Sequence, residues 1–177
     1  MTEQHRILGM RVRIENSRAD IDSAEVLARL ERAMDLIATY APRRLRRMER
    51  DLAGIVVRRF PCRGAFFYQE RECLVELTFT VNPRHSLAEI AASIVHEAMH
   101  ARVAAMCGQL PNHHRPREER LCRKAELEFG RAIPDGQVVV ERARVALAMA
   151  DQDVAPAVDW VAASRRVHAV DGGALGG

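Results

Sequence analysis

Two histidines stand four positions apart, with a glutamate directly after the first, in the segment His96-Glu97-Ala98-Met99-His100. On a helix, residues i and i+4 share one face, so His96 and His100 can each direct an imidazole nitrogen at a single ion. Zinc accepts nitrogen ligands and acidifies a bound water molecule. Glu97 could then accept the proton of that water, which would attack a polarised carbonyl group. The pattern indicates zinc-dependent hydrolysis.

A hydrolytic zinc site needs a third protein ligand and one open position. A third histidine at position 106, after a glycine at position 103, would indicate a metzincin. Those positions hold Met106 and Val103, which excludes that class. Two glutamates further along the chain, Glu119 and Glu126, offer a carboxylate instead.

Glu119, Cys122 and Glu126 have i, i+3, i+7 spacing and therefore share one helix face. If one glutamate binds zinc, the other lies close enough to hydrogen-bond a ligand histidine. The spacing alone leaves open whether Glu119 or Glu126 is the third ligand and which of them supports a histidine. Cys122 is expected to be a small buried apolar residue, and Glu118 a solvated residue in the first turn of the helix.

The motif resembles the gluzincin branch of the HExxH metallopeptidases, in which eighteen residues separate the second histidine from a glutamate ligand. His96, Glu97, His100 and Glu119 match that pattern. The resemblance implies a zinc metallopeptidase with three of these residues as ligands and Glu97 as general base. It also implies an edge strand that pairs with an extended peptide substrate, for which residues 73–81 are the natural choice.

A second resemblance is to compact bacterial metallopeptidases that cleave phage repressors or regulators. There a glutamate upstream of Phe and Pro is the third ligand, which points to Glu126, before Phe129 and Pro134. The chain is also similar to small bacterial proteins with an HExxH-x-Arg motif followed by Glu-x-x-Cys-x-x-x-Glu. With the gluzincin resemblance we favour Glu119 as the third ligand, and Glu126 is the alternative ligand or the supporting residue.

The sequence marks both ends of the helix that carries the motif. Ser86 and Glu89 form a capping box, and Gly108 is a natural stop, so we expect one helix over residues 87–107. Pro116, a favoured first helical residue, begins the next helix after a loop. Tyr68, and the loop residues His113 and His114, are candidates for stabilising an oxyanion.

The remaining patterns predict an α+β fold. Segments rich in β-branched and aromatic residues, with no helix between them, predict about three antiparallel strands. We expect a compact zincin-like domain in which this small sheet packs with the HExxH helix and the ligand helix. The expected parts of this single domain, residues 1–170, are N-terminal helices at 22–51, the sheet at 54–82, metal-binding helices at 86–134 and C-terminal helices at 136–170, followed by a disordered tail at 171–177.

The composition is that of a globular protein, with 48% hydrophobic and 29% charged residues and a net charge of +3. No signal-peptide or membrane-spanning pattern is seen, and the four cysteines lack disulfide or C-x-x-C spacing, so we expect a cytoplasmic protein with no membrane partner. The basic block at residues 43–50 predicts a solvated helix face, and its lack of aromatic residues disfavours a nucleic-acid partner.

The expected function is therefore a Zn²⁺-dependent metallopeptidase that cleaves a peptide or protein substrate. The alternative is a non-catalytic zinc-binding module, with a regulatory or nucleic-acid-associated role. A purely structural site has no need of Glu97, which favours the enzyme. The sequence leaves the substrate and the oligomeric state open.

Overall fold

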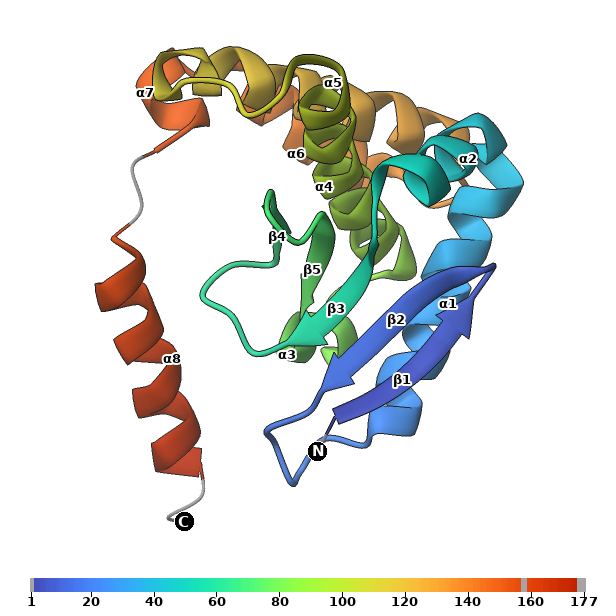
Figure 1. Cartoon of the computed structure of the whole chain (residues 1–177), viewed down its shortest axis with the longest axis vertical. Coiled ribbons are helices and arrows are strands. Elements are labelled where there is room, and N and C mark those ends of the chain that lie inside the picture. The colour runs from blue at the N-terminus through green and yellow to red at the C-terminus, as the bar shows by residue number, and fades with distance from the viewer. Residues whose placement is uncertain (1, 157–158, 175–177) are drawn as a thin grey trace.

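The computed structural model describes residues 2–156 and 159–174 and has an α+β architecture (Figure 1). One five-stranded sheet has the strand order β1-β2-β3-β5-β4. Its strands are β1 (Thr2–Ile7), β2 (Met10–Glu15), β3 (Gly54–Arg58), β4 (Gly64–Phe67) and β5 (Glu72–Glu76). The helices are α1 (Ser23–Tyr40), α2 (Pro42–Asp51), α3 (Leu77–Val81), α4 (Leu87–Cys107), the 3-10 turn η1 (Asn112–His114), α5 (Arg115–Ala132), α6 (Gln137–Ala148), α7 (Asp151–Val154) and α8 (Trp160–Ala174).

The sheet is mixed, so the prediction of three antiparallel strands over residues 54–82 is wrong. The N-terminal segment adds the hairpin β1–β2, which turns at Leu8 and Gly9 with positive φ angles of 48° and 83°. Strands β2 and β3 are parallel because α1 and α2 lie between them in the chain. Strand β5 lies between β3 and β4, parallel to the first and antiparallel to the second.

The last predicted strand, residues 73–81, ends early. Strand β5 stops at Glu76, and the next five residues form helix α3. The Glu76 carboxylate accepts hydrogen bonds from the backbone N–H of Phe79 at 2.7 Å and from the Thr78 hydroxyl at 2.6 Å, which caps the helix. Because β5 is paired on both sides, the sheet edge beside α4 is formed by β4, and the prediction that residues 73–81 form that edge is wrong.

Helix α4 begins and ends where the sequence predicts. Ser86 and Glu89 form both hydrogen bonds of the capping box, and Gly108 follows the last turn with a φ of 71°. The N-terminal helices also match the prediction, because Asp22 caps α1 and Pro42 is the first residue of α2. These boundaries are confirmed because they depend on neighbouring residues alone.

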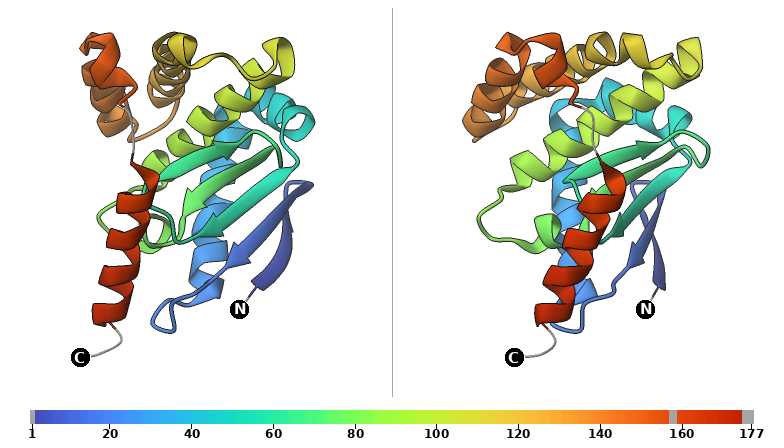
Figure 2. Two further views of the ribbon diagram at one scale, coloured as in Figure 1. Left: turned by 60° about the vertical axis from the view of Figure 1, so that its left-hand side comes forward. Right: turned by 90° about the vertical axis from the view of Figure 1, so that its left-hand side faces the viewer.

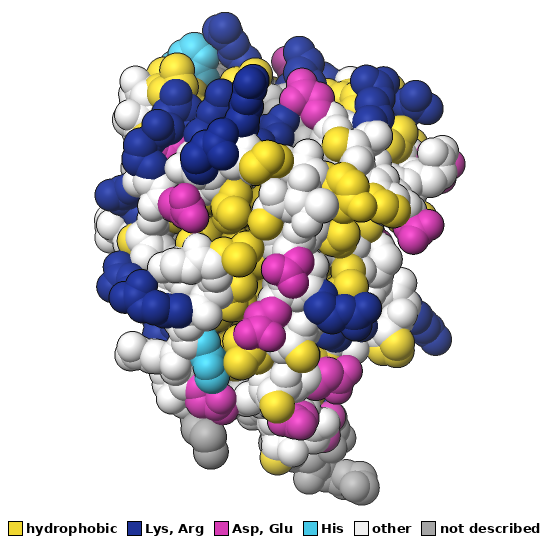
Figure 3. Space-filling model, turned by 90° about the vertical axis from the view of Figure 1, so that its right-hand side faces the viewer, with side chains coloured by type: hydrophobic (Ala, Val, Ile, Leu, Met, Phe, Trp, Pro, Cys, Tyr) yellow, Lys and Arg dark blue, Asp and Glu magenta, His cyan; other side chains and the backbone are white. Residues whose placement is uncertain are grey.

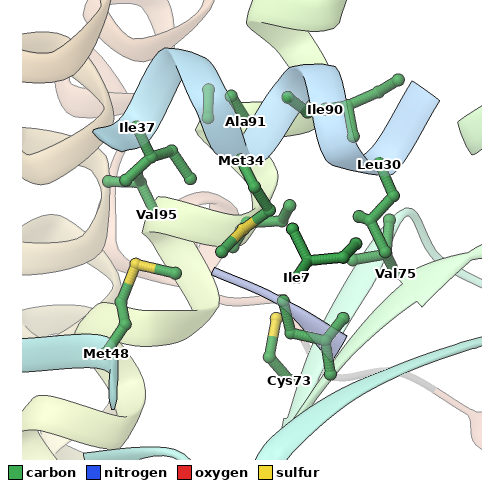
Figure 4. Packing of buried hydrophobic residues seen from close by; sticks show 14 of the residues in the cluster. Ile7, Leu30, Met34, Ile37, Met48, Cys73, Val75, Ile90, Ala91 and Val95 are labelled. Atoms are coloured by element: carbon green, nitrogen blue, oxygen red, sulfur yellow. The ribbon is translucent and has the colours of Figure 1, made fainter. Parts of the chain in front are cut away.

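Helices α1 and α4 cover one face of the sheet and share its core. Figure 4 shows apolar residues of both helices and of the sheet packed together, among them Leu30, Met34 and Ile37 of α1, Ile90, Ala91 and Val95 of α4, and Cys73 and Val75 of β5. Burying a side chain of this size contributes about 1.5–3 kcal/mol. This packing fixes the position of the helix that carries the two motif histidines.

The C-terminal segment is more ordered than expected. The tail predicted from residue 171 is helical as far as Ala174, and residues 175–177 lie outside the described residues. Helix α8 runs alongside the sheet on the side away from α1 (Figure 2). Asp171 anchors it by ion pairs with Arg59 and Arg18, both at 2.9 Å.

The basic block lies on helix α2, where most of its arginines are exposed and Met48 is buried. Lys and Arg side chains gather on the upper part of the molecular face shown in Figure 3, the side on which α2 lies. This agrees with the predicted solvated helix face. In the part of the chain that the structure describes, no helix has both the length and the apolar character needed to cross a membrane.

Candidate metal centre

The two motif histidines face the same carboxylate. His96 and His100 lie one turn apart on α4, with ring centroids separated by 5.1 Å. Glu119 comes from α5, which packs against α4, and its two oxygens lie 3.3 Å from Nε2 of His96 and 3.5 Å from Nε2 of His100. The Glu119 carboxylate thus lies between the two rings, with one oxygen toward each Nε2 atom.

The opposite nitrogen of each ring is occupied by another carboxylate of α5. Nδ1 of His96 bonds to Glu126 at 2.5 Å, and Nδ1 of His100 bonds to Glu118 at 2.7 Å. Histidines that bind metals commonly hold Nδ1 in this way, which fixes the ring and leaves Nε2 for the ion. Glu126 therefore lies behind His96, while Glu119 lies on the side where a ligand is needed.

Glu97 is buried in the wall of the same pocket. Strand β4 crosses close above it, and a Cβ atom added at Gly64 would lie 2.9 Å from Oε1 of Glu97 and 2.8 Å from Oγ of Ser93. Any other residue at position 64 would require the ends of these two side chains to shift. Burial raises the pKa of Glu97, although the nearby His96 and His100 oppose the shift, which suits a group that must accept a proton.

The pocket in front of these residues has a volume of about 580 Å³ and is lined by residues of β4, α4, α5 and α6. His96, Glu97, His100 and Glu119 all contribute to its surface. The volume lies within the range of small-molecule and peptide-binding clefts. An ion held between the histidines and Glu119 would therefore have an open side that a substrate can reach.

The electrostatics of the described residues favour a cation. Burial lowers the pKa of His96, but hydrogen bonds with Glu119 and Glu126 outweigh it and raise that pKa to about 10. Burial likewise opposes the charged form of His100, and Cys122, Glu118 and Glu119 raise its pKa. The histidine contacts lower the pKa of Glu119 in spite of burial. A divalent ion that replaces the imidazole protons meets the same ionised carboxylates.

Cys122 offers a second ligand set. Its sulfur and one nitrogen from each of His96 and His100 all lie within 4.8 Å of one another, and thiolate sulfur is a good zinc ligand. Cys122 is fully buried, however, and is absent from the described residues that line the pocket, whereas Glu119 lines it. Both donor sets suit zinc; only the set with Glu119 faces the open side.

Two expectations about neighbouring residues are corrected. Glu118 is not a solvated residue, because only 5% of its surface is exposed and its carboxylate contacts His100 and accepts a hydrogen bond from the Tyr68 hydroxyl at 2.7 Å. His113 and His114 stack on each other in η1, with centroids 4.2 Å apart, and do not line the pocket. Tyr68 does line it.

The arginines beside Glu126 were not anticipated from the sequence. Arg123 donates a hydrogen bond to Glu126 at 2.7 Å, and Arg142 of α6 approaches its other oxygen at 3.4 Å. The i, i+3 spacing of Arg123 and Glu126 could have indicated the first contact. No local signal indicates the second, which depends on how α6 packs against α5.

Comparison with known protein families, curated proteins and solved structures yields no match to this chain. The function is therefore inferred from the residues of the site and their geometry.

Proposed function

We propose that the chain is a zinc-dependent metallopeptidase with His96, His100 and Glu119 as metal ligands and Glu97 as general base. The observation that carries the proposal is the position of Glu119 between two Nε2 atoms whose rings are each fixed from behind by another carboxylate. Such second contacts are typical of metal sites. Buried histidines that serve packing alone do not need them on both rings.

The residues of the chain suit amide hydrolysis. A bound zinc ion supplies a Lewis acid that acidifies water and polarises a carbonyl group. Glu97 is close to the two histidines and can accept the proton of the attacking water and pass it to the leaving amine. Its burial, with Gly64 packed above it, holds the carboxylate in one position.

Strand β4 suits the positioning of a peptide. It is the edge of the sheet, and Gly64, Ala65 and Phe66 line the pocket. An extended peptide could pair with this edge as an added strand and pass its backbone in front of Glu97. An edge strand above the HExxH helix, with a ligand helix on the far side, is the zincin-like arrangement that we propose for this domain.

The test compares metal content and peptide cleavage in matched variants. We expect the purified protein to bind about one zinc ion and to cleave a degenerate peptide library. Glu97→Gln should retain zinc and lose cleavage by a factor of about 10² or more, because it removes the base. Glu119→Ala should lose zinc. Glu126→Ala should retain zinc with weakened affinity, and Cys122→Ala should retain it with unchanged affinity.

Two results would contradict the proposal. Zinc binding without cleavage of any library peptide, in the wild type as in Glu97→Gln, would indicate a non-catalytic zinc module. Loss of zinc in Cys122→Ala but not in Glu119→Ala would exclude the ligand set proposed here.

A further inference from the structure

One wall of the pocket carries three arginines that share two carboxylates. Arg123 and Arg142 contact opposite oxygens of Glu126 at 2.7 Å and 3.4 Å. Arg142 also lies 3.7 Å from Glu89, and Arg63 approaches the same Glu89 oxygen at 3.6 Å. Glu126 is in addition hydrogen-bonded to an imidazole. These three arginines therefore outnumber the two carboxylates that they share.

Two of these guanidinium groups each have a hydrogen-bond donor without a partner among the described residues. The Nε atoms of Arg123 and Arg142 are buried and have no hydrogen-bond partner in the described part of the chain. Unpaired buried donors are costly and rare in native proteins, and each calls for an explanation such as a bound ligand. Both side chains remain about a quarter exposed, at 27% and 28%, and both line the pocket. A ligand in the pocket could contact the exposed part of each side chain, whereas the buried Nε atoms would become available only if the side chains shifted.

The arginines lie next to the reaction centre. Oxygen Oε1 of Glu126 contacts both Nδ1 of His96 and Nη1 of Arg123, so the guanidinium lies within two hydrogen-bond lengths of the imidazole. The opposite end of the pocket is different, because there Glu118 is hydrogen-bonded to the neutral Tyr68 hydroxyl. Arg123 and Arg142 thus place positive charge beside His96, while Arg115 lines the pocket from the first turn of α5.

We propose that Arg123 and Arg142 bind a carboxylate of the substrate within about one residue of the cleaved bond. The planar guanidinium matches a carboxylate with two parallel hydrogen bonds, which gives both affinity and orientation. The carboxylate could be the C-terminus of a peptide or an Asp or Glu side chain. The inference rests on the proposed peptidase function and specifies its substrate class.

Equilibrium binding tests the inference without turnover. The full chain with Glu97→Gln, loaded with zinc, is titrated against fluorescein-labelled degenerate peptides that lack Asp and Glu and end in either a free acid or an amide. A second pair of amidated libraries carries one Glu or one Gln at a random position. We expect one of the two carboxylate-bearing libraries to bind at least about tenfold more tightly than its neutral partner. The pair that shows the preference identifies the source of the carboxylate.

The arginines are tested by substitution in the same protein. Arg123→Met and Arg142→Met should reduce the acid-to-neutral preference to about threefold or less. Arg131→Met, an exposed arginine at the other end of α5, is the matched control and should keep it. If Arg142 only positions Glu126, its loss would weaken binding of both partner libraries equally and leave their ratio unchanged, which would overturn the inference.

Cleavage by the zinc-loaded wild type separates this inference from the proposed function. We expect mass spectrometry of the products to place the cut within about one residue of the carboxylate. Equal cleavage of acid and neutral libraries would support the peptidase function and exclude the carboxylate-binding site. Selective binding without any cleavage would support the carboxylate-binding site and contradict the peptidase function. No binding of any library would overturn the inference.

Discussion

The two imidazoles of the candidate metal centre are held alike but have neighbours of different charge. The site has a His96 end, formed by His96, Glu126, Arg123 and Arg142, and a His100 end, formed by His100, Glu118 and Tyr68. At both ends a buried glutamate contacts Nδ1. At the His96 end two guanidinium groups hold that glutamate, whereas at the His100 end a neutral hydroxyl does so.

Glu126 and Glu118 make similar contacts with the imidazoles but are stabilised by different neighbours. The pKa of Glu126 is lowered in spite of burial, first by the hydrogen bond with His96 and then by the charges of Arg123 and Arg142. Tyr68 donates a single neutral hydrogen bond to Glu118, and the tyrosine stays protonated because burial and Glu118 raise its pKa. Removal of Glu126 would leave Arg123 without its glutamate partner and Arg142 with only its contact to Glu89. Removal of Glu118 would leave the Tyr68 hydroxyl without its acceptor and the charged His100 ring with only Glu119.

The largest expected effect comes from removing the two glutamate charges separately. Glu126→Gln should lower the free energy of unfolding of the metal-free protein by about 2–3 kcal/mol, because Arg123 loses its glutamate partner and Arg142 keeps only its 3.7 Å contact with Glu89. Glu118→Gln should cost less, about 1–2 kcal/mol, because His100 keeps its contact with Glu119 and Tyr68 is neutral. Both should weaken zinc binding by about 10–100-fold. Urea unfolding in the presence of a chelator and competition with a zinc indicator measure the two quantities.

The matched control for this pair is Glu128→Gln on the same helix, where the glutamate side chain is 68% exposed and contacts Arg44. It should change neither quantity by more than about 0.5 kcal/mol. Equal losses for Glu126→Gln and Glu118→Gln would show that the arginines do not distinguish the two ends.

The next largest effect concerns Glu97, the proposed general base, which lies near both histidines. Gly64→Ala would place a methyl group 2.9 Å from the Glu97 carboxylate and 2.8 Å from the Ser93 hydroxyl. We expect peptide cleavage to fall by about 10–100-fold, with zinc content unchanged because none of the three proposed ligands is touched. Cleavage rates and metal content are measured on the same preparation.

A second substitution identifies which contact matters. Adding Ser93→Ala to Gly64→Ala relieves the contact with the hydroxyl but not the contact with Glu97, so activity should stay low. Full recovery of cleavage in the double variant would mean that Gly64 makes room for Ser93 alone.

The stability of the metal-free protein should depend on pH in a direction set by the histidines. The pKa of His96 is raised from 6.5 to about 10 in the folded protein. Its contribution is therefore fully present below pH 6.5 and is lost as the pH rises toward 10. We expect a loss of about 1–3 kcal/mol over this interval, measured by urea unfolding with chelator at pH 6, 8 and 9.5.

The same protonation predicts proton release on zinc binding, because the ligands must give up their protons. Calorimetry at pH 7 in buffers of different ionisation enthalpy should detect about two protons released per ion. In His96→Gln the loss of stability with pH should shrink. A stability that stays constant from pH 6 to 9.5 in the wild type would contradict the assignment of charged imidazoles.

Local sequence patterns predict the part of the fold that carries the motif. The capping box of Ser86 and Glu89 and the stop at Gly108 depend on a few neighbouring residues, and they are confirmed. The N-terminal hairpin was missed although Val12 and Ile14 alternate with arginines. Helix α3 was predicted as a strand because its residues favour strands, and the cap from Glu76 overrides that preference.

The candidate site shows a similar division. The one-turn spacing of His96 and His100 follows from helix geometry alone. The burial of Glu118, one residue before Glu119, could not be predicted because it depends on how the first turn of α5 meets α4 and Tyr68. The contact of Arg142 likewise joins α6 to α5 across a turn whose geometry the sequence does not specify.

The smallest expected effect is at the His100 end, where Tyr68→Phe removes the hydroxyl that donates to Glu118. Loss of one neutral hydrogen bond should cost about 1 kcal/mol of stability and weaken zinc binding by a few-fold, with Tyr40→Phe on the exposed face of α1 as the control. If Tyr68 instead turns to donate to the developing oxyanion, cleavage should fall by about 10²–10³-fold with zinc affinity nearly unchanged. Rate and zinc affinity measured together on this variant therefore separate a residue that holds Glu118 from one that contacts the substrate.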